Sequence, residues 1–221
     1  MTLAQRLEAV DDRIAEVARA AGRSPAEITR IVVTKFHPAN LVRELAALGV
    51  RDLGENRSQE AEAKAAELSD LGLRWHFVGQ LQSNKARRVR RYAFAVHSVD
   101  RPGLVTALAG EGELGVFLEL DLSGEPGRGG VEPDAVLPLA EQVLDTPGLR
   151  LLGVMAVAPL GVEPSRAFAR VREASEELRG LAPHATAISA GMSADFEAAI
   201  REGATHLRIG TAITGKRPDR D

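Results

Sequence analysis

A lysine at the end of a predicted strand is the residue of this chain best suited to covalent chemistry. The stretch 31–34 is rich in β-branched residues and predicts a buried strand, and Lys35 follows it directly. An amine at the end of a buried strand is poorly solvated, which favours its neutral, nucleophilic form. The alternative is that Lys35 extends its charged end to the surface and has no chemical role, and the spacing alone favours this alternative.

Two loops that combine glycine and hydroxyl residues could bind an anion. The first covers residues 189–193 and the second is Gly210 with Thr211, and each lies between a predicted strand and a predicted helix. Backbone N–H groups at a helix amino terminus are unpaired, and the helix dipole favours an anion there. Ser193 taken alone would be an ordinary N-cap of the helix 194–202. Because the two loops belong to neighbouring units of the chain, together they favour a phosphate site.

Arg208 is predicted to face away from its neighbours Leu207 and Ile209, because side chains alternate along a strand. An arginine inside a fold needs hydrogen-bond acceptors. A pyridine nitrogen would serve, and it would stay unprotonated because arginine does not give up its proton. An ion pair with Glu119 or Asp121 is the other interpretation, and the residues do not decide between the two.

A phosphate site near a strand-end lysine indicates two chemistries. One is a Schiff-base aldolase that acts on a sugar phosphate without a cofactor. The other is a protein that holds pyridoxal 5′-phosphate (PLP) as an internal aldimine. Both would use the Lys35 amine, so these residue types alone leave the choice open.

The elements that must position these residues alternate between strands and helices along the whole chain. A helix over residues 3–17 and a capping-box turn at Ser24 to Glu27 lead into about eight β–α units of similar length. The strands are predicted at residues 31–34, 52–53, 75–78, 94–98, 115–122, 151–157, 187–189 and 206–209. The helices are predicted at residues 39–48, 58–68, 85–91, 102–109, 133–144, 165–178 and 194–202, with a short helical end after Thr211.

Such alternation requires parallel strands joined by right-handed helical crossovers. Eight units favour an α/β fold in which a single (β/α)8 TIM-type barrel closes, with an additional N-terminal helix, and an open doubly wound sheet is the alternative. No linker or low-complexity run divides the chain, so residues 1–221 are expected to form one domain. In a barrel of this kind functional side chains gather at the carboxyl ends of the strands.

The composition is that of a globular protein without thiol chemistry. Of the 221 residues, 44% are hydrophobic and 27% charged, none is cysteine, and the formal net charge is −3. The lack of cysteine excludes disulfides, thiolate metal sites and cysteine nucleophiles. Residues 1–22 carry charges throughout and have no apolar core of a signal peptide, and no stretch is apolar enough to span a membrane. A cytoplasmic location without membrane contact is therefore expected.

One basic cluster could suggest nucleic-acid binding, but the negative net charge and the absence of interleaved aromatic residues oppose it. A solvated helix face is predicted instead, although a subset could receive a phosphorylated vitamer. The cluster consists of Lys85, Arg87, Arg88, Arg90 and Arg91. No metal site is predicted, because the histidines show no ligand spacing such as His-x-x-x-His.

Six short pieces in a fixed order carry a resemblance to a known family. They are Val33-Thr-Lys35, Gly54-Glu-Asn56 with Gln59-Glu60, Trp75-His-Phe-Val-Gly79 with Leu81-Gln-Ser-Asn-Lys85, Gly153-Val-Met155, Ser189-Ala-Gly-Met-Ser193 and Arg208-Ile-Gly-Thr211. With these pieces the chain resembles the pyridoxal-phosphate homeostasis family, from about residue 31 to residue 216. That family is related in fold to the N-terminal domain of alanine racemase.

The resemblance implies one barrel with PLP bound covalently to Lys35 as an internal aldimine. It implies that Arg208 faces the pyridine nitrogen and that Asn56 and His76 lie near the ring. It implies phosphate contacts from Ser189, from Gly191 or its neighbour, and from Gly210 and Thr211. The chain departs from many relatives at Arg57 and Ser58 and at Phe36 and His37, which concerns the rim. Arg128 in the glycine-rich loop 123–130 is expected to be a solvated charge.

The resemblance further implies a protein that binds and supplies PLP with little or no catalytic turnover. An unprotonated pyridine nitrogen is a poor electron sink, and the only tyrosine, Tyr92, is predicted far from the mouth of the barrel. The alternative is a small PLP-dependent amino-acid racemase. The expected partners are PLP and related B6 vitamers, with PLP-dependent apo-enzymes as candidate acceptors, and a monomer is expected.

Overall fold

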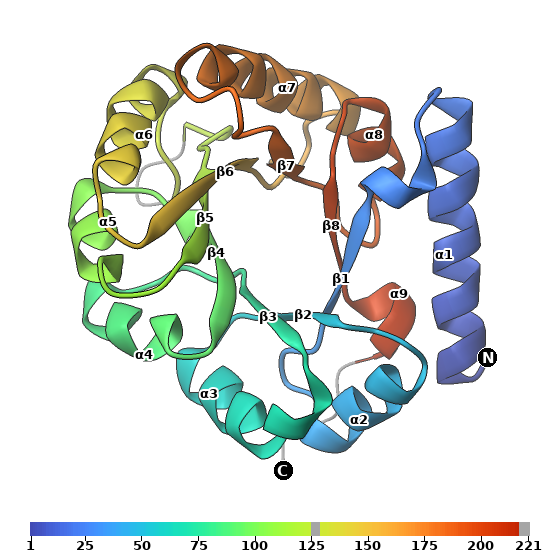
Figure 1. The fold of residues 1–221 in the computed structure, drawn as a ribbon. Helices are drawn as coiled ribbons and strands as arrows, with labels where there is room; N and C mark the ends of the chain where they lie inside the picture. Colours follow the sequence, from blue (N-terminus) through green and yellow to red (C-terminus); the bar gives the residue numbers. More distant parts are fainter. Residues whose placement is uncertain (125–128, 217–221) are drawn as a thin grey trace.

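Eight parallel strands form a closed barrel in the computed structural model, which describes residues 1–124 and 129–216. Each strand pairs with its neighbours in the chain, and β8 returns to pair with β1 (Figure 1). The strands are β1 (Thr29–Val33), β2 (Asp52–Glu55), β3 (Arg74–Phe77), β4 (Ala93–Val99), β5 (Leu114–Glu119), β6 (Leu149–Met155), β7 (Ala187–Ser189) and β8 (His206–Ile209). The closed barrel predicted from the alternation is confirmed, and the open sheet is excluded.

A ring of helices surrounds the barrel, as Figure 1 shows in a view along its axis. The helices are α1 (Leu3–Ala20), α2 (Ala39–Ala47), α3 (Ser58–Glu67), α4 (Ala86–Arg90), α5 (Pro102–Leu108), α6 (Val136–Leu144), α7 (Pro164–Leu181), α8 (Phe196–Arg201) and α9 (Thr211–Thr214). Short 3-10 turns cover Pro25–Glu27, Ser69–Leu71, Ser83–Lys85 and Pro133–Ala135. None of the helices in residues 1–124 and 129–216 has both the length and the apolar character that crossing a membrane requires.

The predicted strand at 115–122 is too long, because β5 ends at Glu119. Leu120 makes only an isolated bridge to Val131, across the start and end of the glycine-rich loop. Arg128 of that loop lies outside the described residues, so its predicted role as a solvated charge stays a prediction. The predicted helix at 194–202 is also too long, since α8 begins at Phe196.

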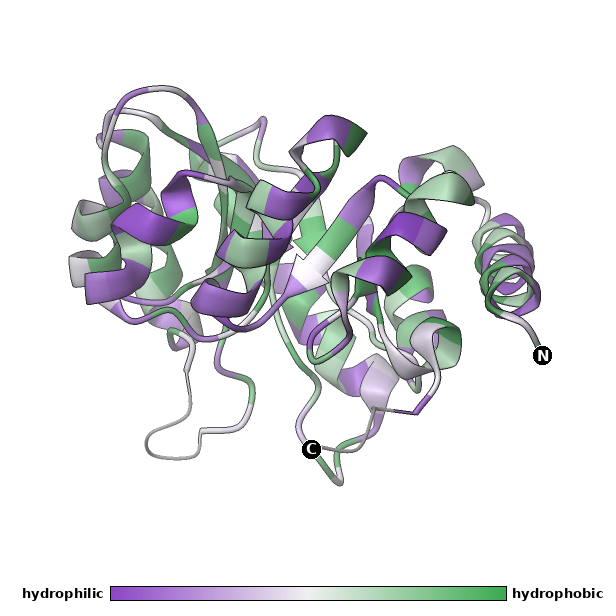
Figure 2. Cartoon of the chain, turned by 90° about the horizontal axis from the view of Figure 1, so that it is seen from below, coloured by the Kyte–Doolittle hydropathy of each residue, from purple (hydrophilic) through white to green (hydrophobic). Residues whose placement is uncertain are grey.

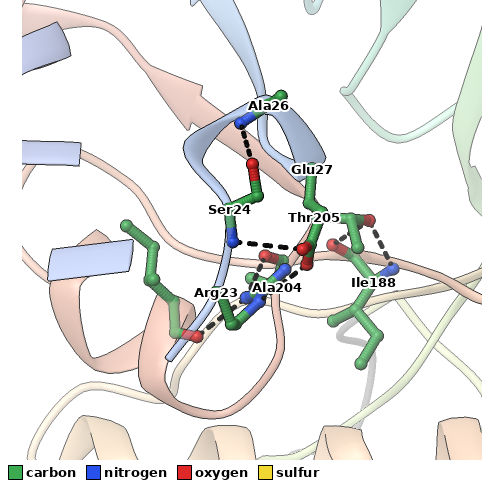
Figure 3. Close-up of polar contacts among 8 residues, drawn as sticks. Arg23, Ser24, Ala26, Glu27, Ile188, Ala204 and Thr205 are labelled. Carbon is green, nitrogen blue, oxygen red and sulfur yellow. Dashed lines mark hydrogen bonds and ion pairs between the residues drawn. The ribbon is translucent and has the colours of Figure 1, made fainter. Parts of the chain in front are cut away.

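The N-terminal helix α1 lies outside the ring, beside α8 and α9 (Figure 1). The capping box predicted after it is present: the Glu27 carboxylate accepts from the Ser24 backbone N–H at 3.1 Å, and the Ser24 hydroxyl accepts from the Ala26 N–H at 3.3 Å. Arg23 donates to the carbonyls of Ile200 and Ala204 at 2.9 and 2.8 Å (Figure 3). These contacts fix the entry into β1 against the loop that leads into β8.

Most of the apolar core lies between the strands and the helices. Each helix supplies it from one face, and Figure 2 shows hydrophilic and hydrophobic residues side by side along α1 and the other helices. A smaller apolar cluster consists of Ala95, Phe117 and Met155. Buried polar residues on neighbouring strands accompany it, among them His76, His97 and Arg208, so the barrel carries an unusually polar set of buried side chains.

Candidate functional site

A cavity of about 410 Å³ opens at the carboxyl ends of β1, β2 and β8. Its wall combines apolar side chains with a few polar groups, which is typical of a small-molecule site. It is lined by Val33, Lys35, Asn56, Val78, Val157, Met192, Ser193, Ala194, Arg208, Gly210 and Thr211. The structure thus brings together five of the eight residues predicted for the site, namely Lys35, Asn56, Arg208, Gly210 and Thr211.

Lys35 lies in a turn two residues beyond the end of β1 and is half-buried at the cavity wall. The next residue, Phe36, has a φ of +68°, which is uncommon for a bulky side chain. Pro38 then precedes the first residue of α2. The lysine is therefore carried by a sharply bent connection between a strand and a helix, and its side chain reaches the cavity from that bend.

Arg208 is buried on β8 and is held by the backbone of the two preceding strands. Its Nη1 donates to the Ser189 carbonyl and to the Ser189 hydroxyl, each at 2.7 Å, and its Nη2 donates to the Ala156 carbonyl at 2.8 Å. Burial lowers the pKa of Arg208 to about 10, although the charges of Glu119 and Asp195 oppose this shift. Arg208 therefore keeps its proton at neutral pH and presents a fixed cation to the cavity.

Ser193 joins the two loops that were predicted to bind an anion. It does not cap α8, as the sequence had suggested, because the N-cap of α8 is Asp195. Its hydroxyl oxygen instead accepts from the N–H groups of Gly210 and Ala212, each at 3.3 Å. Since an oxygen that accepts twice still has its own hydrogen, the Ser193 O–H group can donate into the cavity.

Backbone donors complete the wall between these loops. Within the described residues no acceptor is found for the N–H groups of Ser193, Ala194 and Thr211, all of which line the cavity. Gly191 makes the sharp bend before them with a φ of +91°, and a Cβ atom there would lie 2.7 Å from the Ala199 side chain. Gly191 thus shapes the loop without lining the cavity, and several donors converge where an anion would fit.

The side chains of Ser189 and His76 are engaged by other buried side chains. The Ser189 hydroxyl is fully buried and contacts Arg208 on one side and His97 Nδ1 at 2.8 Å on the other. His76 contacts His97 Nε2 at 3.0 Å through its Nδ1 and Asp52 at 2.9 Å through its Nε2. Neither Ser189 nor His76 lines the cavity. Both belong to a chain of hydrogen bonds that runs through buried side chains toward the amino end of β2.

Asn56 follows β2 and is placed by a close approach of the next loop. A Cβ atom on Gly79 would lie only 2.6 Å from the Asn56 carbonyl oxygen, so only glycine allows this contact. Asn56 also lines a neighbouring, more open cavity of about 610 Å³ together with Arg57 and Lys85. Of the departures noted at the rim, Arg57 and Ser58 line this second cavity, whereas Phe36 and His37 lie in the turn that follows Lys35.

The basic cluster is only partly a solvated face. Arg90 donates to the carbonyls of Leu108, Glu111 and Gly112 at 2.7 to 2.8 Å and so anchors the loop after α5. Tyr92 is absent from the Lys35 cavity and lies just before β4, at the amino end of the barrel, as expected. Across residues 1–124 and 129–216, no group of three histidine or carboxylate side chains is close enough to hold a metal ion.

Comparisons with known proteins agree with this geometry. The family model described as "Alanine racemase, N-terminal domain" matches residues 5–218. A "Pyridoxal phosphate homeostasis protein" of Pseudomonas aeruginosa is 46% identical over 225 residues, which cover 98% of this chain and 96% of that protein. The protein of the same name from Escherichia coli K12 is 38% identical over 226 residues, with 97% of each chain covered.

Among solved structures, PipY of Synechococcus elongatus with PLP bound is 36% identical, with a TM-score of 0.84 over 97% of this chain and all of that one. The same protein without PLP gives a TM-score of 0.85. Alanine racemase of Corynebacterium glutamicum has the same fold at 18% identity, with a TM-score of 0.69 over 96% of this chain and 62% of that one.

Proposed function

The chain belongs to the pyridoxal phosphate homeostasis protein family, within the alanine racemase N-terminal domain family, and from this premise we propose that it binds PLP in the Lys35 cavity. The observation that carries the proposal is the meeting of one lysine, one buried arginine and several N–H donors around a single cavity, where these donors find no acceptor in the part of the chain that the structure describes. When bound, PLP supplies an aldehyde that condenses with a primary amine and releases one water molecule.

The residues of the cavity fit the three functional parts of PLP. Lys35 supplies the amine for the Schiff base. Ser193 O–H and the N–H groups of Ala194 and Thr211 supply donors for the phosphate. We assign the serine contact to Ser193 rather than to Ser189, because the Ser189 hydroxyl is engaged by Arg208 and His97. Gly210 supports this contact through its N–H bond to Ser193.

Arg208 is proposed to donate to the pyridine nitrogen, which its retained proton would keep unprotonated. Three of the five N–H donors of a guanidinium are used by Ser189 and Ala156, which leaves donors for a ligand. A second acid or base that could exchange a proton with a bound amino acid is not supplied by Tyr92, which lies at the other end of the barrel. These features support carriage of PLP with little or no turnover.

An absorption spectrum tests the covalent attachment. The purified protein mixed with PLP is expected to show the visible band of a Schiff base, and Lys35→Ala is expected to abolish it. Lys85→Ala, which changes a lysine of the neighbouring cavity, is the control and should retain the band. After borohydride reduction, peptide mass analysis should find the pyridoxyl group on Lys35. A band that survives in Lys35→Ala, or a pyridoxyl group on another lysine, contradicts the proposal.

Isotope exchange tests the lack of turnover. The PLP-loaded protein is incubated in heavy water with a panel of amino acids, and each is analysed for deuterium at the α-carbon. No exchange above that of free PLP is expected. Exchange at the α-carbon that depends on Lys35 would instead identify the protein as a small amino-acid racemase or a related enzyme.

A further inference from the structure

A second lysine lies behind the Lys35 turn and, unlike Lys35, it is buried and fully engaged. Lys64 of α3 donates to the Thr34 carbonyl at 2.9 Å, to Glu55 Oε1 at 2.7 Å and to Glu60 Oε1 at 2.8 Å. An ammonium group has three N–H donors, so all of them are used. Lys64 does not line the Lys35 cavity, and the cofactor assignment gives it no role.

The two carboxylates around Lys64 also contact the residues on either side of Lys35. The Thr34 hydroxyl donates to Glu55 Oε1 at 2.7 Å, and the Phe36 N–H donates to Glu60 Oε1 at 2.7 Å. These hydrogen bonds hold the chain immediately before and immediately after Lys35. We call the group the Lys64 cluster, and it consists of Thr34, Glu55, Glu60 and Lys64. Three separate elements meet there: the end of β1, the end of β2 and the first turns of α3.

The cluster offsets a backbone conformation that the sequence does not favour by itself. Phe36 adopts a φ of +68°, which lies in the left-handed region of backbone conformations. This region costs free energy for residues other than glycine or asparagine. Such a conformation persists only where the surroundings hold it, and the bond from the Phe36 N–H to Glu60 does so directly. If this bond were lost, the turn could relax, and the peptide plane that carries Lys35 would rotate.

A stabilising role alone explains the cluster poorly. A buried ion pair contributes little net stability over apolar residues of similar volume, because the desolvation of its charges offsets their attraction. Glu55 is almost fully buried, and burial raises its pKa although Lys64 opposes the shift. Its Oε2 atom has no hydrogen-bond partner within the described residues. Burying these charges costs free energy, yet their hydrogen bonds converge on the residues next to Lys35. Such an arrangement is typical of groups that position a functional side chain.

We infer that Lys64 is a positioning residue which, through Glu55 and Glu60, holds the Lys35 turn so that the Lys35 amine reaches the aldehyde carbon of a PLP molecule whose phosphate is already bound. The inference rests on the proposed function. In the condensation the amine nitrogen bonds to that carbon and the aldehyde oxygen leaves as water. Lys64 takes no part in bond making, and it acts only on where the amine lies relative to the carbon.

Two ligands separate the positioning of the amine from the integrity of the cavity. PLP reports phosphate binding and Schiff-base formation together. Pyridoxine 5′-phosphate has the same ring and phosphate but an alcohol in place of the aldehyde, so it reports the cavity without the amine. Affinities are measured by calorimetry for pyridoxine 5′-phosphate and by the visible Schiff-base band for PLP.

Lys64→Met removes the ammonium group at similar length. We expect the equilibrium constant for the Schiff base to fall by about tenfold or more, since small misplacements of a reacting group have effects of this size. The affinity for pyridoxine 5′-phosphate should stay close to that of the unchanged protein. Lys64→Arg should not restore the band, because a planar guanidinium cannot direct three donors to the positions that an ammonium occupies.

Glu60→Ala is a second variant that keeps the test decisive if Lys64→Met does not fold. Glu60 is partly exposed, and its removal frees the Phe36 N–H while Lys64 keeps its bond to Glu55. The same split between the two ligands is expected, with a smaller loss of the Schiff base. Glu62→Gln is the matched control, because Glu62 lies on the same helix and pairs with Arg88 at the surface.

The possible outcomes separate PLP binding at Lys35 from the positioning role inferred for Lys64. If the unchanged protein forms no Schiff base at Lys35, the proposed function and this inference both fall. If it forms one and both Lys64→Met and Glu60→Ala keep it at full strength, the inference alone falls. If both ligands lose affinity in parallel in the folded variants, the cluster has a structural role and the inference is again overturned. A selective loss of the Schiff base supports it.

Discussion

Two polar regions of this barrel differ in how their hydrogen-bonding groups are used. The first, here called the closed chain, runs from Asp52 near the amino end through His76 and His97 to Ser189. The second is the Lys35 cavity at the carboxyl ends of the strands. In the closed chain each polar group meets a partner from the protein, whereas several donors of the cavity find no acceptor among residues 1–124 and 129–216. The difference separates a self-satisfied network from the proposed ligand site.

One consistent assignment of hydrogens runs through the closed chain. Burial by itself would raise the pKa of Asp52, but hydrogen bonds from His76 and Arg74 outweigh it and lower the pKa, so Asp52 is a carboxylate. A carboxylate only accepts, and therefore His76 Nε2 carries a hydrogen and its Nδ1 accepts from His97 Nε2. His97 Nδ1 then accepts from the Ser189 hydroxyl. The burial of His97 lowers its pKa well below the usual value, so His97 is neutral in this assignment.

Arg208 belongs to both regions, because it donates to the oxygen of Ser189 and also lines the cavity. The closed chain thus ends on the cation that is proposed to face the pyridine nitrogen. A ligand site needs donors left open on one side and a rigid support on the other, and Arg208 marks the boundary between the two.

Arg208→Met should have the largest effect, because it removes a donor from the closed chain and a cation from the Lys35 cavity. The Ala156 carbonyl would lose its Arg208 donor inside the barrel, which costs roughly 1–3 kcal/mol for a buried acceptor, whereas the Ser189 carbonyl would keep the hydrogen bond from the Ala156 N–H. The free energy of unfolding in urea should therefore fall by about 1–3 kcal/mol, and the affinity for pyridoxine 5′-phosphate should fall with it. Arg87→Met, at an exposed position of α4, is the control. A loss of affinity with unchanged stability would show that the closed chain does not depend on Arg208.

The sequence predicted the barrel and the position of Lys35 because both follow from repeating patterns. β-Branched runs and amphipathic helices mark the units, and a lysine just beyond a strand must lie at the carboxyl end. Alternation along β8 likewise predicted that Arg208 lies on the face opposite to Leu207 and Ile209, and the structure shows that this side chain is buried. These inferences need only the order of residues within one element.

The positions of His76, Ser189 and Ser193 relative to the cavity did not follow from such patterns. Alternation tells which face of a strand a residue occupies, but its height along the barrel depends on the register between strands, such as His76 opposite Gly54 and Ser189 opposite His206. The contact of Ser193 with the next loop was hidden for another reason. Residues 190–195 form an irregular loop, and whether Ser193 caps its own helix or reaches the next loop is decided by tertiary packing.

The pH dependence of stability provides a further test of the buried polar groups, through a histidine that lies beside the closed chain. His206 packs against Phe117 beside this chain, and burial lowers its pKa to about 4. The unfolded chain binds a proton at this histidine near pH 6.5 and the folded protein does not, so stability falls as the pH drops below 6.5. Each such histidine contributes a slope of about 1.4 kcal/mol per pH unit until the folded pKa is reached.

Unfolding in urea between pH 7 and pH 4 measures this slope, and His206→Gln isolates one contribution. Between the unfolded pKa near 6.5 and the folded value, the free energy of unfolding of the variant should fall less steeply than that of the unchanged protein. The two slopes should differ by about 1.4 kcal/mol per pH unit. Other groups, such as Glu55 with its raised pKa, contribute to both proteins equally and cancel. Equal slopes in the two proteins would mean that His206 is protonated in the folded state as readily as in the unfolded chain.

Two serines four residues apart offer the finest test of the boundary. Ser189→Ala leaves His97 Nδ1 without its donor in the buried chain and should cost about 1–2 kcal/mol of unfolding free energy. The affinity for pyridoxine 5′-phosphate should hardly change. Ser193→Ala removes a hydroxyl at the cavity wall, and the loss of a hydrogen bond to a charged phosphate should weaken the affinity by about tenfold or more.

The stability of Ser193→Ala should be nearly unchanged. The Ser193 hydroxyl accepts from the Gly210 and Ala212 N–H groups in partly buried positions, where water can replace the hydroxyl. Opposite losses in the two variants follow from one geometric fact, the engagement of the Ser189 hydroxyl by Arg208 and His97. If Ser189→Ala lost affinity and Ser193→Ala did not, that hydroxyl would have to turn toward the phosphate when the ligand binds. The hydrogen bond between Ser189 and His97 would then break on ligand binding, and Ser189 would belong to the closed chain only while no ligand is bound.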